Sequence, residues 1–241
     1  PVSARAIISI IAGLALSGGT AVAAPPAGDG PRTIVAIGDG LVAGPPTSAA
    51  KPVAGGWVPS LADCLEERAP GRFALVDRAA PGETAATARE RLAAVKKLAP
   101  AMVVMSLGAQ ELADPDTTSE ALRTDLQQLA AEVGDTQVLL VGLVAPTLTQ
   151  TAYADVNRQR RADERTTEFN AAVADLAKAS DRLVHVDLWR DWPRDAARAD
   201  LTQKGWSLSE QGHARVAAAV CDAVVAGTEA EPAGAAAPSP P

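Results

Sequence analysis

Aromatic residues are scarce in this chain of 241 residues, in which Phe, Trp and Tyr together make up 3% of the sequence. A hydrophobic core must therefore be filled by aliphatic side chains and alanine. With 47% hydrophobic and 21% charged residues, the composition is that of a globular protein, which excludes a wholly disordered chain and a collagen-like one. The two cysteines are too few for a disulfide-dense mini-protein.

Clusters of positive charge are also missing. The 22 Lys and Arg residues are outnumbered by 29 Asp and Glu residues, which gives a formal net charge of −7. A nucleic-acid-binding protein needs grouped basic side chains to neutralise phosphates, so we expect no nucleic-acid partner. The length suits one α/β domain or two small ones.

The apolar segment near the N-terminus, Ala6–Leu16, is too short to cross a membrane, because a hydrocarbon core of about 30 Å requires about 20 apolar residues in a helix. Arg5 precedes this segment and the small residues Ala21–Ala23 follow it, which is typical of a signal peptide. We therefore predict a signal peptide over residues 1–23. The mature protein is expected to be secreted or periplasmic, without a stable membrane anchor.

Export bears on the two cysteines. Cys64 shares an apolar helical stripe with Leu61, and Cys221 shares another with Val224. Because an oxidising compartment favours disulfides, we expect Cys64 and Cys221 to be joined, which would tie the first helix to the last. The alternative is two buried free thiols that behave as small hydrophobic side chains.

Short, continuously apolar runs alternate with helical patterns along the chain, as parallel strands covered on both faces require. Five runs predict strands at Thr33–Ile37, Phe73–Val76, Met102–Leu107, Gln137–Leu143 and Leu183–Val186. Helices are predicted near Val58–Arg68, Thr84–Leu98, Ser119–Val133, Ala154–Ala179 and Ser209–Val225. The pattern indicates a single three-layer α/β/α domain with a five-stranded parallel sheet.

This domain is expected over residues 33–226, after a linker at residues 24–32. A Pro/Ala-rich segment, 227–241, is predicted to be a disordered tail. Ser209 is a candidate N-cap for the last helix. In such a sheet, ligands bind beyond the carboxyl ends of the strands, so the loops there are where chemistry is expected.

Four blocks occupy those loops and the start of the last helix. They are Gly38–Leu41, Asp77–Thr84, Leu107–Glu111 and Thr202–Gly212. In this order and spacing they resemble the SGNH (GDSL) hydrolase family. The resemblance implies a flavodoxin-like strand order 2-1-3-4-5 and hydrolysis of acyl esters. It also implies a serine nucleophile, a histidine base with an aspartate, and an oxyanion hole made by two backbone amides and an asparagine side chain.

The catalytic positions of that family are substituted in this chain. Gly40 stands at the serine position, Lys204 at the aspartate position and Ser207 at the histidine position. Gln110 and Glu111 replace the asparagine and aspartate of the third block. We therefore predict that the chain has no catalytic residues and that these positions are degenerate.

The second block departs less from the family. Gly82 matches its family counterpart, whereas Ala79 replaces a glycine. Glu111 is expected to pack or to cap a helix start, and Asp39 to hold its own loop, although either could in principle act on a water molecule.

No replacement for the missing machinery stands out. Of the two histidines, His185 is expected to be a structural residue of the fifth strand with its hydrogen bonds satisfied, and His213 to pack or lie on the surface of the last helix. A dyad of Ser207 and Lys204 is less plausible than a polar loop. No spacing typical of metal ligands occurs, so neither metal nor cofactor is expected.

Backbone amides at Gly40 and Gly82, with the side chains of Gln110 and Lys204, would form a receptor for an anion or a carbonyl group. The sequence therefore favours a monomeric, inactive pseudo-hydrolase that binds an acyl, carboxylate or carbohydrate group. Two alternatives stay open: a weak or rerouted ester hydrolase of the esterase/lipase type, and a structural or protein-interaction module of the cell envelope.

Overall fold

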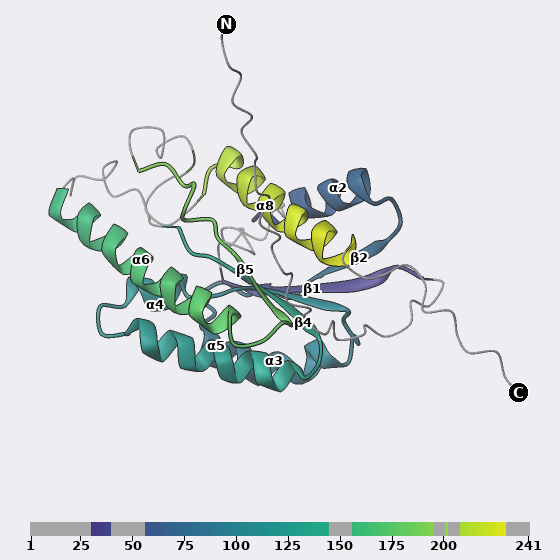
Figure 1. Ribbon diagram of the computed structural model, residues 1–241, viewed down its shortest axis with the longest axis horizontal. Coiled ribbons are helices and arrows are strands. Elements are labelled where there is room, and N and C mark those ends of the chain that lie inside the picture. The colour runs from purple at the N-terminus through teal and green to yellow at the C-terminus, as the bar shows by residue number, and fades with distance from the viewer. Residues whose placement is uncertain (1–29, 40–55, 145–155, 195–200, 202–207, 230–241) are drawn as a thin grey trace, which may run out of the picture.

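A computed structural model describes residues 30–39, 56–144, 156–194, 201 and 208–229. Its centre is a sheet of five parallel strands in the order β2-β1-β3-β4-β5, which confirms the predicted fold class and strand order (Figure 1). The strands are β1 (Arg32–Gly38), β2 (Phe73–Asp77), β3 (Met102–Ser106), β4 (Gln137–Val141) and β5 (Leu183–Val186).

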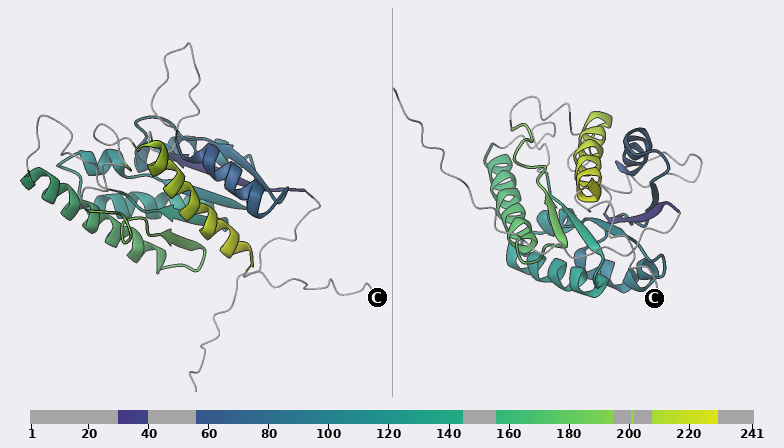
Figure 2. Two further views of the ribbon diagram at one scale, coloured as in Figure 1. Left: turned by 90° about the horizontal axis from the view of Figure 1, so that it is seen from above. Right: turned by 45° about the vertical axis from the view of Figure 1, so that its right-hand side comes forward.

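Helices cover both faces of this sheet (Figures 1 and 2). The pair α2 and α8 lies on one face, and α3, α5 and α6 lie on the other, while the short α4 follows β3. The helices are α2 (Val58–Arg68), α3 (Ala85–Lys96), α4 (Ala109–Ala113), α5 (Ser119–Val133), α6 (Val156–Ala177) and α8 (Glu210–Glu229). Among the described residues, no helix is both long and apolar enough to span a membrane.

Several element bounds differ by one to a few residues from the prediction, and two differences bear on the site and the tail. Helix α4 forms within the third block, where we expected only a loop. Helix α8 continues to Glu229, past the predicted start of the tail at Gly227. The predicted signal peptide, most of the linker and residues 230–241 lie outside the described residues.

Alternating side chains of the strands fill two separate apolar layers. In β1, Ile34 and Ala36 belong to the cluster that includes α2 and α8, whereas Val35 and Ile37 belong to the cluster on the other face. The period of two follows from the pleat of a strand. Because neither face is open to water, β1, β3 and β4 carry no polar alternation, which explains their continuous apolar runs.

Polar side chains fix where three helices begin. Thr84 caps α3 by accepting a hydrogen bond from the backbone N–H of Thr87 at 3.1 Å, and Thr118 caps α5. Ser209 caps α8 through its Oγ, which accepts from the N–H of Gly212 at 3.1 Å, as predicted. Such caps satisfy amide groups that a helix start leaves without partners.

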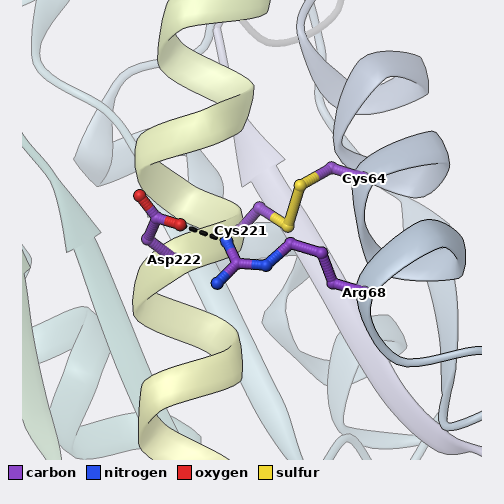
Figure 3. The surroundings of a disulfide bond; sticks show 4 residues. All are labelled: Cys64, Arg68, Cys221 and Asp222. Atoms are coloured by element: carbon purple, nitrogen blue, oxygen red, sulfur yellow. Dashed lines mark hydrogen bonds and ion pairs between the residues drawn. A yellow bond between two sulfur atoms is a disulfide. The ribbon is translucent and has the colours of Figure 1, made fainter.

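A disulfide joins the two helices of one layer. Cys64 of α2 is bonded to Cys221 of α8, with their Cα atoms 6.3 Å apart, so the predicted pairing is confirmed and the alternative of two free thiols is excluded (Figure 3). One turn further along α2, the Arg68 guanidinium forms an ion pair with the Asp222 carboxylate of α8. Helices α2 and α8 are therefore linked covalently and by charge.

Reduction of this disulfide is expected to destabilise the fold. The bond spans 157 residues, and the loop-entropy estimate for a closed loop of that size is about 5 kcal/mol, an upper bound that corresponds to about 10 to 20 °C in Tm. Thermal unfolding of the protein with and without a reductant measures the effect. The double variant Cys64→Ala, Cys221→Ala should unfold at the reduced Tm under both conditions, and a wild-type Tm that ignores complete reduction would contradict the expectation.

Candidate functional site

Backbone hydrogen bonds bring the first three blocks together at the carboxyl edge of the sheet. The N–H of Ala80 donates to the carbonyl of Gly38 at 2.8 Å, and the N–H of Asp39 donates to the carbonyl of Ser106 at 3.4 Å. Asp39 itself is buried, with 1% of its surface exposed. The ends of β1, β2 and β3 are thus neighbours, as the parallel order requires.

Two of the predicted ligand-binding residues, Gly82 and Gln110, lie at this edge within the described part of the chain. The other three positions that the sequence predicts to be degenerate, Gly40, Lys204 and Ser207, lie outside the described residues. The structure therefore describes two parts of the site: the second and third blocks, and the acidic side chains that hold these blocks in place.

Gly82 occupies the third position of a tight turn after β2. The N–H of Glu83 donates to the carbonyl of Ala80 at 3.1 Å, Pro81 is the second residue, and Gly82 has a φ of +78°. These features define a type II turn, which favours proline at its second position and glycine at its third. A Cβ added to Gly82 would meet nothing within 4 Å, so the turn requires glycine for its backbone conformation rather than for space.

The acid that follows this turn is buried and held by an arginine. Glu83 is 5% exposed, and its Oε1 accepts a hydrogen bond of 2.7 Å from Nε of Arg91 on α3 and forms an ion pair with Nη2 of the same side chain at 2.6 Å. Burial raises the pKa of the Glu83 carboxyl, while the Arg91 charge and the backbone N–H of Gly38 oppose that rise. Arg91 also donates to the carbonyl of Arg78, so one guanidinium fastens both ends of the second block to α3.

Glu111 of the third block serves the same helix from the other side. It is 7% exposed, and its Oε1 accepts a hydrogen bond of 2.7 Å from the backbone N–H of Ala85, the first residue of α3. Burial raises the pKa of Glu111, and the Ala85 N–H counteracts this in part. The expectation that Glu111 caps a helix start is confirmed.

Gln110 lies on the short helix between these supports. Helix α4 begins after Gly108, whose φ of +114° is accessible mainly to glycine. A Cβ at Gly108 would also lie 3.0 Å from side-chain atoms of Leu122 and Leu143, so the turn packs tightly on α5. Gln110 is exposed, and its side chain makes no hydrogen bond with the described residues. Its amide is therefore available to a ligand.

A buried asparagine holds the end of β4, and sequence reasoning missed it. Asn170 of α6 accepts from the N–H of Leu143 and donates to the carbonyls of Leu143 and Thr166, at 2.8, 2.8 and 2.9 Å. Gly142 allows this approach, because a Cβ there would lie 2.9 Å from Asn170 Oδ1. The sequence did contain a signal for this role, because a polar residue stands next to Phe169 on the buried side of an amphipathic helix.

The expectation for His185 was wrong in one respect. Its Nε2 is buried and has no hydrogen-bond partner among the described residues, so the ring is not fully satisfied. The nearby Asn170 has already used its amide on backbone groups, and a Cβ on Gly142 would lie only 3.1 Å from His185 Nε2. Burial lowers the pKa of His185, although the Asp187 charge opposes this, which favours the neutral ring.

His213 lies in the first turn of α8 and is half-buried. Burial lowers its pKa, and its Nδ1 has no hydrogen-bond partner in the described ranges. A catalytic histidine is normally oriented by a second group, usually a carboxylate. Neither His213 nor His185 makes a side-chain hydrogen bond to a carboxylate of the described residues, and these residues contain no group of three or more potential metal ligands.

This sheet, with its blocks at the carboxyl ends of β1, β2 and β3, defines the SGNH hydrolase class of α/β folds. The sequence profile of the GDSL-like lipase/acylhydrolase family matches residues 36–215, most of the chain. The chain therefore belongs to the GDSL-like lipase/acylhydrolase family. A search of curated protein sequences found no significant match.

Solved structures with the same fold include enzymes of this type. A lipase/acylhydrolase from Enterococcus faecalis is 22% identical, with a TM-score of 0.62 over 80% of this chain and 95% of that one. A catalytic mutant of an acetylxylan esterase from Geobacillus stearothermophilus is 15% identical, with a TM-score of 0.64 over 80% and 94%. A GDSL-like lipase from Bacteroides thetaiotaomicron is 18% identical, with a TM-score of 0.60 over 81% and 89%. At these identities the likeness establishes the fold alone.

The capping role of Glu111 predicts how two substitutions differ. Glu111→Ala removes the acceptor for the Ala85 N–H and leaves a buried amide without a partner, which should lower the free energy of unfolding by about 1 to 3 kcal/mol. Glu111→Gln keeps an acceptor oxygen of similar reach and should retain most of the stability. Chemical denaturation of both variants at pH 7 checks this, and equal losses would contradict the capping role.

The same variants predict a dependence on pH. Because burial raises the pKa of Glu111, the folded protein binds the proton more tightly than the unfolded chain does. The stability that this provides is fully present below the ordinary pKa of 4.5 and is lost as the pH rises through the higher folded value. Relative to Glu111→Gln, the wild type should lose stability over that interval, and parallel pH profiles in denaturation experiments would refute it.

Proposed function

We propose that this protein is an exported pseudo-hydrolase that binds an acyl, carboxylate or sugar group at the former ester-hydrolysis site without cleaving it. The observation that carries the proposal is the contrast between the two halves of the site. The turn at Gly82, which matches the oxyanion-hole glycine of the family, keeps a type II conformation. The positions of the nucleophile and base hold Gly40 and Ser207, which supply neither group.

An oxyanion hole without a nucleophile is still a receptor for negative charge. Backbone N–H groups and an amide side chain stabilise an oxyanion because they are oriented before the ligand arrives. Gly40, Gly82 and Gln110 would supply these donors, and Lys204, in place of an aspartate, changes the local charge by two units towards positive. A carboxylate or the carbonyl of an acyl group fits such donors.

The acids near the site argue against rerouted hydrolysis. A general base must reach the water that it activates. Glu111 uses Oε1 to cap α3, and Glu83 uses Oε1 on Arg91. The Oε2 atom of each carboxyl has no hydrogen-bond partner among the described residues but is buried, so neither carboxyl presents this oxygen to solvent. Loss of the triad can leave a residual rate through the oxyanion hole alone, which would be a very poor esterase.

The related structures suggest a ligand class. One neighbour is named as an acetylxylan esterase, which is an enzyme for an acetylated polysaccharide. An acetylated or acidic sugar combines the carbonyl or carboxylate that the amides would bind with hydroxyl groups. We propose this class first, and export to the cell envelope or the medium would bring the protein to such polymers.

Binding can be tested with acetate, glucuronate and acetylated xylo-oligosaccharides in NMR titrations of the mature protein. We expect Gly82→Ala to weaken binding, because alanine disfavours a φ of +78° and would change the turn at a cost of about 1 kcal/mol. Gly71→Ala is the matched control, since Gly71 has a φ of +66°, equally open space and a place in another loop. Equal affinities in both variants, or no binding by the wild type, would favour the structural or interaction module.

Restoring the family's residues tests the absence of catalysis. The triple variant Gly40→Ser, Lys204→Asp, Ser207→His should hydrolyse p-nitrophenyl acetate, whereas the wild type should stay near the buffer rate. The reason is that the nucleophile, base and orienting acid return to a frame that already holds oxyanion donors. Wild-type turnover at ordinary esterase rates would overturn the proposal and require a nucleophile elsewhere in the chain.

A further inference from the structure

Helix α4 cannot hold its own position. It has five residues, Ala109–Ala113, and isolated helices of this length are unstable in water. Its last carbonyl groups have no partners within the helix, which is a general property of helix ends. The chain then turns through Asp114, whose carboxylate accepts from the N–H of Asp116 and the hydroxyl of Thr117. An outside group must fix this segment against the rest of the domain.

Arg165 of α6 is that group. Its Nη2 donates to the backbone carbonyls of Asp114 at 2.7 Å, Thr117 at 3.1 Å and Glu111 at 3.3 Å. Its Nη1 lies 3.4 Å from the carbonyl of Pro115. One guanidinium therefore gathers the carbonyl groups at the end of α4 and in the turn that follows, although these residues are about 50 positions away in sequence.

The guanidinium is itself held in place. It lies over the ring of Phe169, 5.3 Å from the centroid, and Phe169 is 1% exposed in the core. Asn170, the next residue of α6, binds both backbone groups of Leu143 beyond β4. Two adjacent turns of helix α6 thus hold the chain after β3 and the chain after β4. Arg165 makes the contact on the side of α4, and its guanidinium is fixed in position.

We propose that Arg165 is a positioning residue of the ligand site, which sets the place of α4 and thereby of the Gln110 amide. The inference rests on the proposed function, because Gln110 is one of the donors assigned to the ligand. Arg165 acts through the backbone of α4, so it controls affinity without belonging to the group of donors. A lysine cannot replace it, since one ammonium group lacks the planar fork that reaches several carbonyls at once.

Two readouts on the same variants test this proposal. Arg165→Met keeps a long apolar side chain on Phe169 but removes the donors, and Arg160→Met is the control, because Arg160 is an exposed residue of the same helix paired only with Glu164 in the described structure. In hydrogen exchange, the amides of Leu112 and Asp114, which close the turns of α4, should exchange about tenfold faster in Arg165→Met alone. The affinity for acetate should fall by at least about threefold in the same variant.

Each outcome decides something. Faster exchange confined to α4, with weaker acetate binding and no rescue by Arg165→Lys, supports the positioning role. Unchanged exchange in α4, or equal acceleration across the sheet and α4, overturns it, and so does faster exchange with unaltered affinity. If the wild type binds no acetate, the proposed function fails at this ligand and the link from Arg165 to affinity falls with it. The exchange comparison still decides separately whether Arg165 holds α4.

Discussion

The arrangement of the candidate site depends on the burial of the parallel sheet on both faces. Strands that are covered on two sides must be apolar throughout, so they cannot themselves carry polar chemistry. The polar residues that follow β1, β2 and β3 therefore lie at the same edge, where the N–H of Ala80 donates to Gly38 and the N–H of Asp39 donates to Ser106. Residues far apart in sequence become neighbours there because the strand order places them so.

Backbone groups at that edge of the sheet need hydrogen-bond partners, and side chains on the helices supply them. Glu111 satisfies the first amide of α3, Asn170 satisfies both backbone groups of Leu143, and Arg165 satisfies the carbonyls after α4. An unpaired buried polar group costs free energy, so each of these side chains is constrained by the partners that it has. The loops of the site are consequently held by side chains that lie on the helices, at a distance in sequence.

The sheet is built from local apolar patterns, whereas the loops of the site are held by distant side chains. This difference explains which features could be predicted from the sequence. Strands and helices follow from apolar periodicity, and the pairing of Cys64 with Cys221 follows from apolar stripes and expected export. Helix α4 was missed because five residues are too few to show a period. The partners of Arg165 and Asn170 were missed because each contact joins two distant segments that only the folded chain brings together. The lack of a hydrogen-bond partner for His185 Nε2 among the described residues was missed for the same reason.

The structure also bears on the proposed loss of the hydrolase residues. A nucleophile and its base are held by the frame and contribute little to it, and functional polar groups often cost stability. In this chain the buried acids of the described edge, Glu83 and Glu111, each have a structural partner, and the Gly82 turn is stabilised by its own backbone hydrogen bond. In the proposed assignment, substitution at Gly40, Lys204 and Ser207 removes the reactive groups but none of these contacts between described residues. The receptor that we propose is what such a frame would become on losing its chemistry and keeping its donors.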